Sequence, residues 1–219
     1  YPLVTGVQTC ALPILIELVY ENLKINANYI FVAQKNDIDK YKIDEHLALF
    51  CENFTLIEQD GKLDGAAKSC LLAWDVIDND SPLVIANSDQ YVEWDAESII
   101  NNFIKSGVDG AILTFNSTDT KWSYAKTNED HIVSAVAEKN AISSNATCGI
   151  YYWKCGSDFV KYAKQMIQKN IKTNNEFYVC PVYNEAIADE KIIIIHEVSG
   201  MHGLGTPDDL KVFLMKSIK

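Results

Sequence analysis

The apolar residues in the first half of the chain predict helices that alternate with strands. Apolar residues recur at helical spacing over residues 15–23, and a compact apolar run with β character follows at residues 29–33. The same alternation continues with helical stretches at residues 37–50, 65–77 and 95–104 and with strands at residues 54–58 and 83–86. Strands and helices that alternate at these lengths are typical of parallel βαβ units.

The second half changes to a pattern that favours β structure. Four β-rich stretches are predicted at residues 111–115, 124–126, 132–137 and 147–153. They are followed by helices over residues 157–169 and 178–188, a strand over residues 191–198 and a last helix that starts at residues 206–207. We therefore expect an α/β fold with a Rossmann-like, doubly wound mixed sheet and antiparallel additions in the second half.

The first residues of the chain do not fit this pattern. Residues 4–14 read VTGVQTCALPI, which resembles the in-frame translation of a DNA-sequencing adapter. The stretch has no basic start, no long apolar core and no small-residue cleavage site, so it does not indicate a signal peptide. A genuine first strand is the other alternative. We expect residues 1–14 to be a non-native leader and residues 15–219 to form a single domain, truncated at its N-terminus.

Composition argues against several classes of partner. The 219 residues are 48% hydrophobic and 22% charged, which suits one folded domain with a sizeable core. A formal charge of −11 argues against a nucleic-acid partner, because such proteins need basic patches to displace counterions. The longest apolar runs are far shorter than the roughly 20 residues of a membrane-spanning helix. The six cysteines form no CxxC pair, which favours a reducing cytoplasm over a zinc site or a disulfide framework.

A short polar cluster follows the predicted strand at residues 83–86. The cluster consists of Asn87, Ser88 and Asp89. Ligands of open α/β sheets bind at the carboxyl ends of strands, and a carboxylate beside bound phosphates suits a divalent metal such as Mg²⁺. The simpler alternative is that Asp89 only opens a turn or caps a helix.

Three other places in the sequence carry candidate binding residues. Gly65 and Ala66 begin a helix, where free N–H groups can bind a base or a phosphate; small residues there can also simply pack on a sheet. Glu138 and Lys139 end a strand, where they can bind hydroxyls and phosphate, or form an exposed ion pair. Glu176 can face a ligand, or it can be an acid that favours a helix start.

Six short segments place these residues in a characteristic order. They are GAA at residues 65–67, ANSDQ at 86–90, AEK at 137–139, ATCGIYY at 146–152, EFY at 176–178 and GTPDDL at 205–210. In this order they resemble the sugar-phosphate nucleotidyltransferase family, which includes glucose-1-phosphate thymidylyltransferases and cytidylyltransferases of capsule and surface-polysaccharide pathways. The resemblance covers residues 15–219 and implies a fold of the nucleotide-diphospho-sugar transferase type.

The resemblance also implies roles for the residues of the nucleotide side. Asp89 is similar to the acid that holds Mg²⁺ against the nucleotide phosphates, which makes it a metal-binding and catalytic candidate. Asn87 and Ser88 belong to the same motif and are substrate-binding candidates. Gly65 and Ala66 match the stretch that lies against the nucleobase.

The acceptor side follows from the resemblance in the same way. Glu138 and Lys139 look like the pair that contacts the sugar hydroxyls and the sugar phosphate, with Lys139 as a catalytic candidate. Gly149 would line the same pocket, and Glu176 is similar to a further acid that faces the acceptor. The implied reaction joins a nucleoside triphosphate to a phosphorylated sugar or similar small molecule and releases pyrophosphate.

Two features depart from the family pattern. Gly203, with His202 beside it, stands where many relatives carry a second metal-binding acid. Relatives also begin with a strand and a glycine-rich loop that carries Arg and Lys, and the adapter-like stretch takes its place. In the strand order 3-2-1-4 that first strand is central, so the strands at residues 29–33 and 83–86 would lose a neighbour. We therefore expect an active natural parent and a nearly inactive chain.

Two other functions stay open at this point. A glycosyltransferase of the related nucleotide-sugar-binding fold would also hold a metal on an acid at a strand end, but the cluster at residues 87–89 is Asn-Ser-Asp and contains no Asp-x-Asp. A non-catalytic nucleotide-sugar-binding subunit is compatible with the missing acid at Gly203.

Overall fold

The computed structural model describes residues 15–217, and the predicted leader lies outside this range. Residues 15–22 are helical, as predicted. The strands that follow are β1 (Tyr29–Gln34), β2 (Phe54–Gln59), β3 (Leu83–Ala86), β4 (Gln90–Glu93), β5 (Gly110–Asn116), β6 (Ser123–Thr127), β7 (Val133–Glu138), β8 (Asn145–Trp153), β9 (Ile193–Glu197) and β10 (Gly200–Gly203). The further helices are α2 (Lys35–Tyr41), α3 (Ile43–Phe50), α4 (Ala66–Leu71), α5 (Trp74–Ile77), α6 (Ala96–Ser106), α7 (Gly156–Gln168), α8 (Val182–Ala188) and α9 (Pro207–Ser217).

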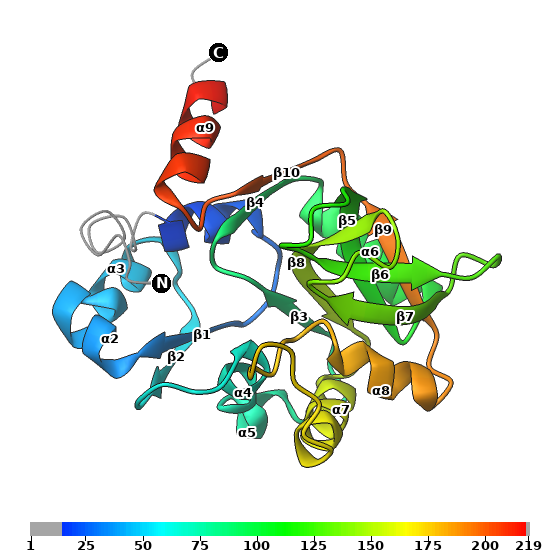
Figure 1. Cartoon of the computed structure of the whole chain (residues 1–219). Helices are drawn as coiled ribbons and strands as arrows, with labels where there is room; N and C mark the ends of the chain where they lie inside the picture. Colours follow the sequence, from blue (N-terminus) through cyan, green and yellow to red (C-terminus); the bar gives the residue numbers. More distant parts are fainter. Residues whose placement is uncertain (1–14, 218–219) are drawn as a thin grey trace.

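The largest sheet has six strands and mixed directions (Figure 1). Its main order is β7-β6-β8-β5-β9, and β3 pairs with the last part of β8. Strand β5 runs parallel to β9 and antiparallel to β8, while β6 and β7 form an antiparallel pair. The mixed α/β class and the antiparallel additions in the second half are therefore confirmed.

Two pairs of strands lie outside this sheet. The parallel pair β1 and β2 confirms one predicted βαβ unit. Within residues 15–217, β1 pairs only with β2 and β3 pairs only with β8, so these strands do not form one continuous sheet. Strands β4 and β10 form an antiparallel pair in which Gln90 is opposite Gly203. Strands β4 and β10 were not predicted, because short strands with polar residues and glycines show no clear alternation of apolar and polar residues.

The predicted helix over residues 37–50 is in fact two helices. Lys42 separates α2 from α3 with a left-handed backbone (φ 51°), and its N–H donates to the carbonyl of Ile38. No glycine or proline marks this position, so the apolar periodicity appears continuous in the sequence.

Two other predicted helices differ from the structure in their bounds. The stretch at residues 65–77 contains α4 and α5, which are interrupted around Leu72 and Ala73. The helix expected over residues 178–188 begins only after Pro181, because Tyr178 and the residues after it form a separate segment that packs on the sheet.

Helices cover both faces of the main sheet, as a doubly wound fold requires. Tyr151 and Trp153 of β8 point to a core shared with α4, α5, α7 and α8, whereas Ile150 and Tyr152 point to a core shared with α6. This alternation is the period of two that an extended strand imposes. A third core cluster, around Leu47, joins α2 and α3 to β1 and β2.

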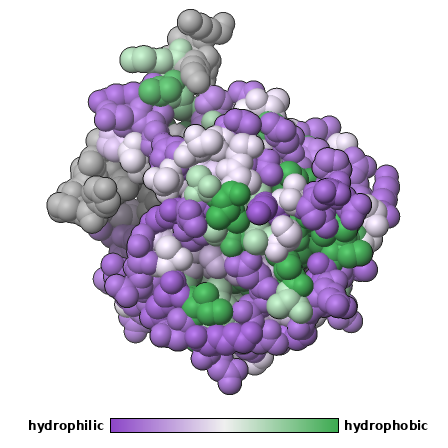
Figure 2. Space-filling model, turned by 45° about the vertical axis from the view of Figure 1, so that its right-hand side comes forward, coloured by the Kyte–Doolittle hydropathy of each residue, from purple (hydrophilic) through white to green (hydrophobic). Residues whose placement is uncertain are grey.

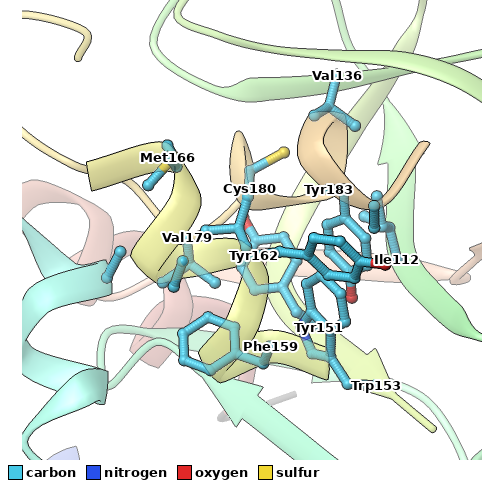
Figure 3. Close-up of a cluster of buried hydrophobic side chains, with 14 of the residues drawn as sticks. Ile112, Val136, Tyr151, Trp153, Phe159, Tyr162, Met166, Val179, Cys180 and Tyr183 are labelled. Carbon is cyan, nitrogen blue, oxygen red and sulfur yellow. The ribbon is translucent and has the colours of Figure 1, made fainter. Parts of the chain in front are cut away.

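Helix α8 is held against the sheet by an aromatic stack and by backbone hydrogen bonds. The rings of Trp153 and Tyr183 lie 4.2 Å apart and nearly parallel, in the core drawn in Figure 3. The buried Tyr183 hydroxyl donates to the carbonyl of Tyr152 at 2.8 Å. At the edge of the sheet, the Asn184 amide both donates to and accepts from the backbone of Val136 in β7, each at 2.9 Å.

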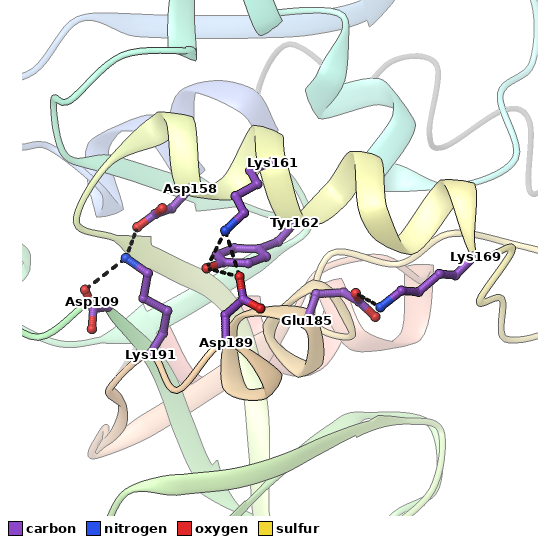
Figure 4. Close-up of polar contacts among 8 residues, drawn as sticks. All are labelled: Asp109, Asp158, Lys161, Tyr162, Lys169, Glu185, Asp189 and Lys191. Atoms are coloured by element: carbon purple, nitrogen blue, oxygen red, sulfur yellow. Dashed lines mark hydrogen bonds and ion pairs between the residues drawn. The ribbon is translucent and has the colours of Figure 1, made fainter.

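Ion pairs add a polar layer around α7 and α8 (Figure 4). Lys191 bridges Asp158 at 2.9 Å and Asp109 at 3.4 Å. Two pairs join α7, or the residue that follows it, to α8 or its end: Lys161 with Asp189 and Lys169 with Glu185. The Lys161–Asp189 pair is exposed, and such pairs contribute at most about 1 kcal/mol each. The other pairs are partly buried, where the cost of removing the charges from water offsets much of their attraction. The apolar core therefore determines where α8 lies.

The surface drawn in Figure 2 is mostly hydrophilic, with hydrophobic residues in several separate patches. None of the helices between residues 15 and 217 combines the length and the hydropathy that crossing a membrane requires.

The left-handed backbone at Lys42 predicts that a glycine there raises the free energy of unfolding, whereas a glycine inside a continuous helix would lower it. Lys42→Gly is expected to raise the free energy of unfolding by about 0.5–1 kcal/mol, because glycine adopts the left-handed conformation without a Cβ clash. The control Ala48→Gly, at an exposed position inside α3, is expected to lower it by about 1 kcal/mol. Urea unfolding measures both. If Lys42→Gly destabilises the protein as much as Ala48→Gly does, the separation of α2 and α3 at Lys42 is contradicted.

Candidate active site

Asp89 lies in the turn that connects β3 to β4, so the expectation of an acid just after a strand is confirmed. Its carbonyl accepts a hydrogen bond of 2.7 Å from the N–H of Leu204. Its carboxylate lies against Gly205, where an added Cβ would stand only 2.6 Å from Oδ2. Only glycine lets the segment after β10 approach Asp89 this closely.

A second carboxylate, that of Asp209, lies beside this turn. Asp209 belongs to the first turn of α9, and its N–H donates to Thr206 Oγ1 at 3.1 Å. The Thr206 hydroxyl in turn donates to Asp209 Oδ2 at 2.6 Å. A Cβ placed on Gly203 would be 3.7 Å from that same oxygen. Sequence reasoning missed Asp209, because a Thr-Pro-Asp-Asp pattern indicates only a helix cap.

The two carboxylates influence each other. The pKa of Asp89 is raised, mainly because the surrounding protein displaces water from the carboxylate and further because Asp209 carries a negative charge nearby. Mg²⁺ typically binds proteins through one or two carboxylates and fills its other positions with water and substrate phosphates. The pair fits that requirement. Residues 15–217 contain no group of three or more His, Cys, Asp or Glu side chains arranged to hold a metal.

Asn87, Ser88 and Gly149 lie on the Asp89 side of the site. The N–H of Asn87 donates to the carbonyl of Gly149 at 2.9 Å, while Ser88 is exposed in the turn. The Cα of Gly149 packs directly against the side chains of Asn87 and Gln90. Among the described residues, the buried Oε1 of Gln90 finds no hydrogen-bond donor. Gly149 thus packs against the Asp89 motif, and the expectation that it lines the same pocket as Glu138 and Lys139 stays a prediction.

Lys139 is oriented by an aromatic hydroxyl. It follows the last residue of β7 in a left-handed conformation (φ 54°). Its Nζ donates to the Tyr178 hydroxyl at 2.8 Å and lies 4.9 Å from the centre of that ring. This hydrogen bond, with smaller contributions from nearby negative groups, raises the pKa of Lys139. The ammonium group is therefore charged at neutral pH, in the position expected from the sequence.

Glu138 and Glu176 lie close enough to Lys139 to interact with it. Glu138 accepts a hydrogen bond from Ser123 Oγ. Burial raises the pKa of Glu138, the negative charge of Glu176 adds to this effect, and Ser123 and Lys139 oppose it. The structure thus brings together Glu138, Lys139 and Glu176, which lie up to 38 positions apart in the sequence. Tyr178, which the sequence did not single out, connects them.

Gly65 and Ala66 begin α4 next to the segment that carries Glu176. Gly65 (φ 117°) packs against the backbone of Phe177, and the Phe177 N–H donates to the carbonyl of Asp64 at 2.8 Å. The expectation of free N–H groups at this helix start needs a correction. The N–H of Ala67 already donates to the carbonyl of Phe177 at 3.0 Å, because the approaching segment supplies an acceptor.

Trp122 connects the two halves of the site. Its carbonyl accepts a hydrogen bond of 3.0 Å from the N–H of Lys139. The far edge of its indole ring, Cη2, is 3.8 Å from the position of a Cβ on Gly203. One residue thus links the Lys139 group to the turn that holds Asp89 and Asp209, and nothing in the local sequence indicated this role.

Solved structures with the same fold are sugar-nucleotide and related transferases. The nucleoside-diphosphate-sugar pyrophosphorylase of Vibrio cholerae RC9 matches with a TM-score of 0.74 and 21% identity, over 96% of this chain and 85% of its own. A UDP-glucose pyrophosphorylase in complex with UDP-glucose matches with a TM-score of 0.69 and 14% identity, over 94% and 86%. The inositol-1-phosphate CTP transferase of T. maritima matches with a TM-score of 0.68 and 13% identity, over 93% and 82%. At these identities the likeness shows the fold.

Sequence comparison identifies the family. Comparison with curated proteins finds no significant match. The sequence model of the family described as nucleotidyl transferase matches residues 6–197, which is most of the chain. The chain therefore belongs to the nucleotidyl transferase family.

Proposed function

We propose that the chain transfers a nucleotidyl group from a nucleoside triphosphate to a sugar phosphate or a similar phosphorylated small molecule. A phosphate oxygen of the acceptor forms a bond to the α-phosphorus, the bond from that phosphorus to the β-phosphate oxygen breaks, and pyrophosphate leaves. The observation that carries the proposal is the link, through Trp122, between an acidic turn at Asp89 and a lysine with two acids at the end of β7. The acidic turn suits a metal ion with bound phosphates, and the lysine with its two acids suits a phosphorylated sugar.

Asp89 is the residue that we propose to hold Mg²⁺. A bound Mg²⁺ would supply positive charge that offsets the phosphates and fixes their orientation. The chain has a formal charge of −11, so its own field opposes the approach of a triphosphate. A metal held by Asp89 would offset this local negative charge, and Asn87 and Ser88 in the same turn would offer polar groups to the nucleotide.

Lys139 is the residue that we propose to bind the phosphate of the acceptor. All 19 basic residues of the chain are lysines, so no arginine is present to form a bidentate contact with phosphate. Tyr178 orients the charged Lys139 ammonium, which retains two further protons to donate. Glu138 and Glu176 would accept hydrogen bonds from sugar hydroxyls. That a UDP-glucose pyrophosphorylase of this fold was solved with UDP-glucose supports a sugar as the acceptor.

Three further expectations from the sequence are also proposals. Gly65 and Ala66 would lie against the nucleobase, where the close packing on Phe177 leaves a small-residue surface. A cytoplasmic location is proposed from the pattern of cysteines. A role in surface-polysaccharide synthesis is proposed from the family resemblance. Within residues 15–217 all five cysteines are free, which agrees with a reducing compartment.

A panel of nucleoside triphosphates and sugar phosphates, with Mg²⁺ present, tests the reaction. We expect pyrophosphate only when both substrates are present, and an Asp89→Ala variant to lower the rate by about 10²-fold. Consumption of a nucleotide sugar without pyrophosphate would assign the chain to glycosyl transfer instead. Ligand-induced shifts in the melting temperature without either reaction would assign it to a binding subunit.

The role of Lys139 predicts a selective loss of acceptor binding. Lys139→Ala is expected to weaken binding of the sugar phosphate about tenfold or more, because a charge-assisted hydrogen bond contributes about 1.5–3 kcal/mol. The matched control is Lys126→Ala, which removes the same charge from an exposed position on β6. Titration calorimetry measures both affinities. Equal effects of the two substitutions would show that only net charge matters.

Glu138 predicts a pH-dependent difference in stability. Because its folded pKa is raised above the unfolded value, it contributes stability that is present below the unfolded pKa of about 4.5 and is lost as pH rises through the folded pKa. Glu138→Gln cannot ionise, and its amide oxygen still accepts from Ser123. We expect the variant to be more stable than the wild type at neutral pH and equally stable near pH 4, as measured by urea unfolding. The exposed control Glu129→Gln should show a smaller change with pH. A constant difference for Glu138→Gln would contradict the effect of burial.

A further inference from the structure

We propose that Ser123 is a positioning residue, which holds the Glu138 carboxylate in place to accept a hydroxyl of the acceptor. Buried hydroxyls of Tyr151 and Thr147 restrict Ser123 in turn. This inference rests on the proposed function, since it takes Glu138 as a residue that meets the sugar. It assigns a selectivity to the site, because phosphorylated acceptors that carry hydroxyls would bind better than phosphate alone.

The pairing of β6 with β7 places Ser123 and Glu138 side by side. The two residues are directly opposite each other in this antiparallel pair, so their side chains lie on the same face of the sheet. The Ser123 hydroxyl donates to Oε2 of Glu138. A carboxylate has a second oxygen that can accept a hydrogen bond from a ligand. One oxygen of Glu138 therefore meets the protein, and the other suits an acceptor hydroxyl.

Two buried hydroxyls of β8 lie next to Ser123. Thr147 and Tyr151 are 3% and 4% exposed, and their hydroxyl oxygens are 3.0 Å apart. Burial raises the pKa of Tyr151 well above its usual value, and hydrogen bonding with Thr147 and Ser123 opposes this rise. A buried hydroxyl without a hydrogen-bond partner costs free energy. These groups therefore restrict the directions in which the Ser123 hydroxyl can point.

Cys180 completes this buried group from the segment before α8 (Figure 3). Burial raises the pKa of its thiol, and the negative charge of Glu138 adds to this effect, whereas hydrogen bonding with Ser123 and Tyr151 opposes it. The thiol therefore stays neutral at neutral pH and adds no charge next to Glu138. The same segment carries Tyr178, the hydrogen-bond partner of the Lys139 ammonium group. One stretch of chain thus borders both the lysine and the acid of the proposed acceptor site.

The Ser123 hydrogen bond also affects the charge of Glu138. Burial raises the pKa of Glu138, and the hydrogen bond from Ser123 is the largest effect that opposes this rise. The charge of Lys139 lowers the pKa as well, while that of Glu176 raises it. A donor hydroxyl stabilises the charged form of a carboxyl group, in which both oxygens accept hydrogen bonds. Ser123 therefore favours the form of Glu138 that receives sugar hydroxyls.

The titration of Glu138 tests the contact without any ligand. Carbon-13 NMR of the full chain, labelled at the glutamate carboxyl carbons, follows each carboxyl group with pH, and the resonance lost in Glu138→Gln assigns Glu138. We expect Ser123→Ala to raise the pKa of Glu138 further, because the carboxylate loses a hydrogen bond. Ser123→Thr keeps the hydroxyl and is expected to retain the wild-type value. The control Ser134→Ala removes an exposed hydroxyl of β7 and should leave the titration unchanged.

A second substitution tests the buried support. Tyr151→Phe removes one hydroxyl next to Ser123, and we expect it to raise the pKa of Glu138 less than Ser123→Ala does. In the Ser123→Ala background it should have no further effect, because Tyr151 acts on Glu138 through Ser123. If the two substitutions add fully, the support of Ser123 by Tyr151 is wrong.

Ligand selectivity tests the role of Ser123 in the site. Titration calorimetry compares glucose 1-phosphate with inorganic phosphate, which can reach Lys139 but carries no sugar hydroxyl. We expect Ser123→Ala to weaken binding of glucose 1-phosphate about fivefold, the effect of one hydrogen bond, and to leave the affinity for inorganic phosphate unchanged. Ser123→Thr should recover the loss. A general distortion of the site would weaken both ligands, as Lys139→Ala is expected to do.

The outcomes separate this inference from the proposed function. A raised pKa of Glu138 with a selective loss of glucose 1-phosphate supports Ser123 as a positioning residue. An unchanged pKa in Ser123→Ala, or an equal effect on the two ligands, overturns it. If the wild type binds inorganic phosphate but not glucose 1-phosphate, a sugar phosphate as acceptor is contradicted, and the titration still decides whether Ser123 holds Glu138.

Discussion

The docking of helix α8 is the constraint on which the position of the Lys139 group depends. The Trp153–Tyr183 stack buries one side of α8 on β8, and the Asn184 amide pairs with the backbone of β7. The segment just before α8 carries Tyr178, whose hydroxyl orients Lys139 at the end of β7. A shift of α8 would therefore move the partner of Lys139 as well. The stack of two buried aromatic rings thus influences the geometry of a charged group on another element.

The Asp89 side of the site depends on a different contact, the pairing of β4 with β10. This pair places the residues after β10 against the turn at Asp89 and carries α9 with them. The two halves thus come from separate parts of the fold, and Trp122 is the residue common to both. In a chain of formal charge −11, this division keeps the acids that suit a metal apart from the lysine that suits a phosphate.

Much of the fold was predictable because its cause is local. Apolar periodicity located β3 at residues 83–86 without error and most other strands to within two residues. It failed at Lys42, where a lysine adopts a conformation that glycine usually marks, and at β4 and β10, which are too short to show a period. The family order of motifs also led to Asp89, Glu138, Lys139 and Glu176. The last three form one interacting group in the structure.

By itself, the sequence determined the α/β class and the order of most elements, because each follows from neighbouring residues in the chain, whereas the candidate site residues were proposed from the order of the family motifs. Only the tertiary structure decided that Tyr178 holds Lys139, that Trp122 joins the two halves and that the Asp209 carboxylate lies beside Gly203. The physical reason is that these contacts join residues of different elements. No local pattern encodes the distance between side chains that packing alone brings together.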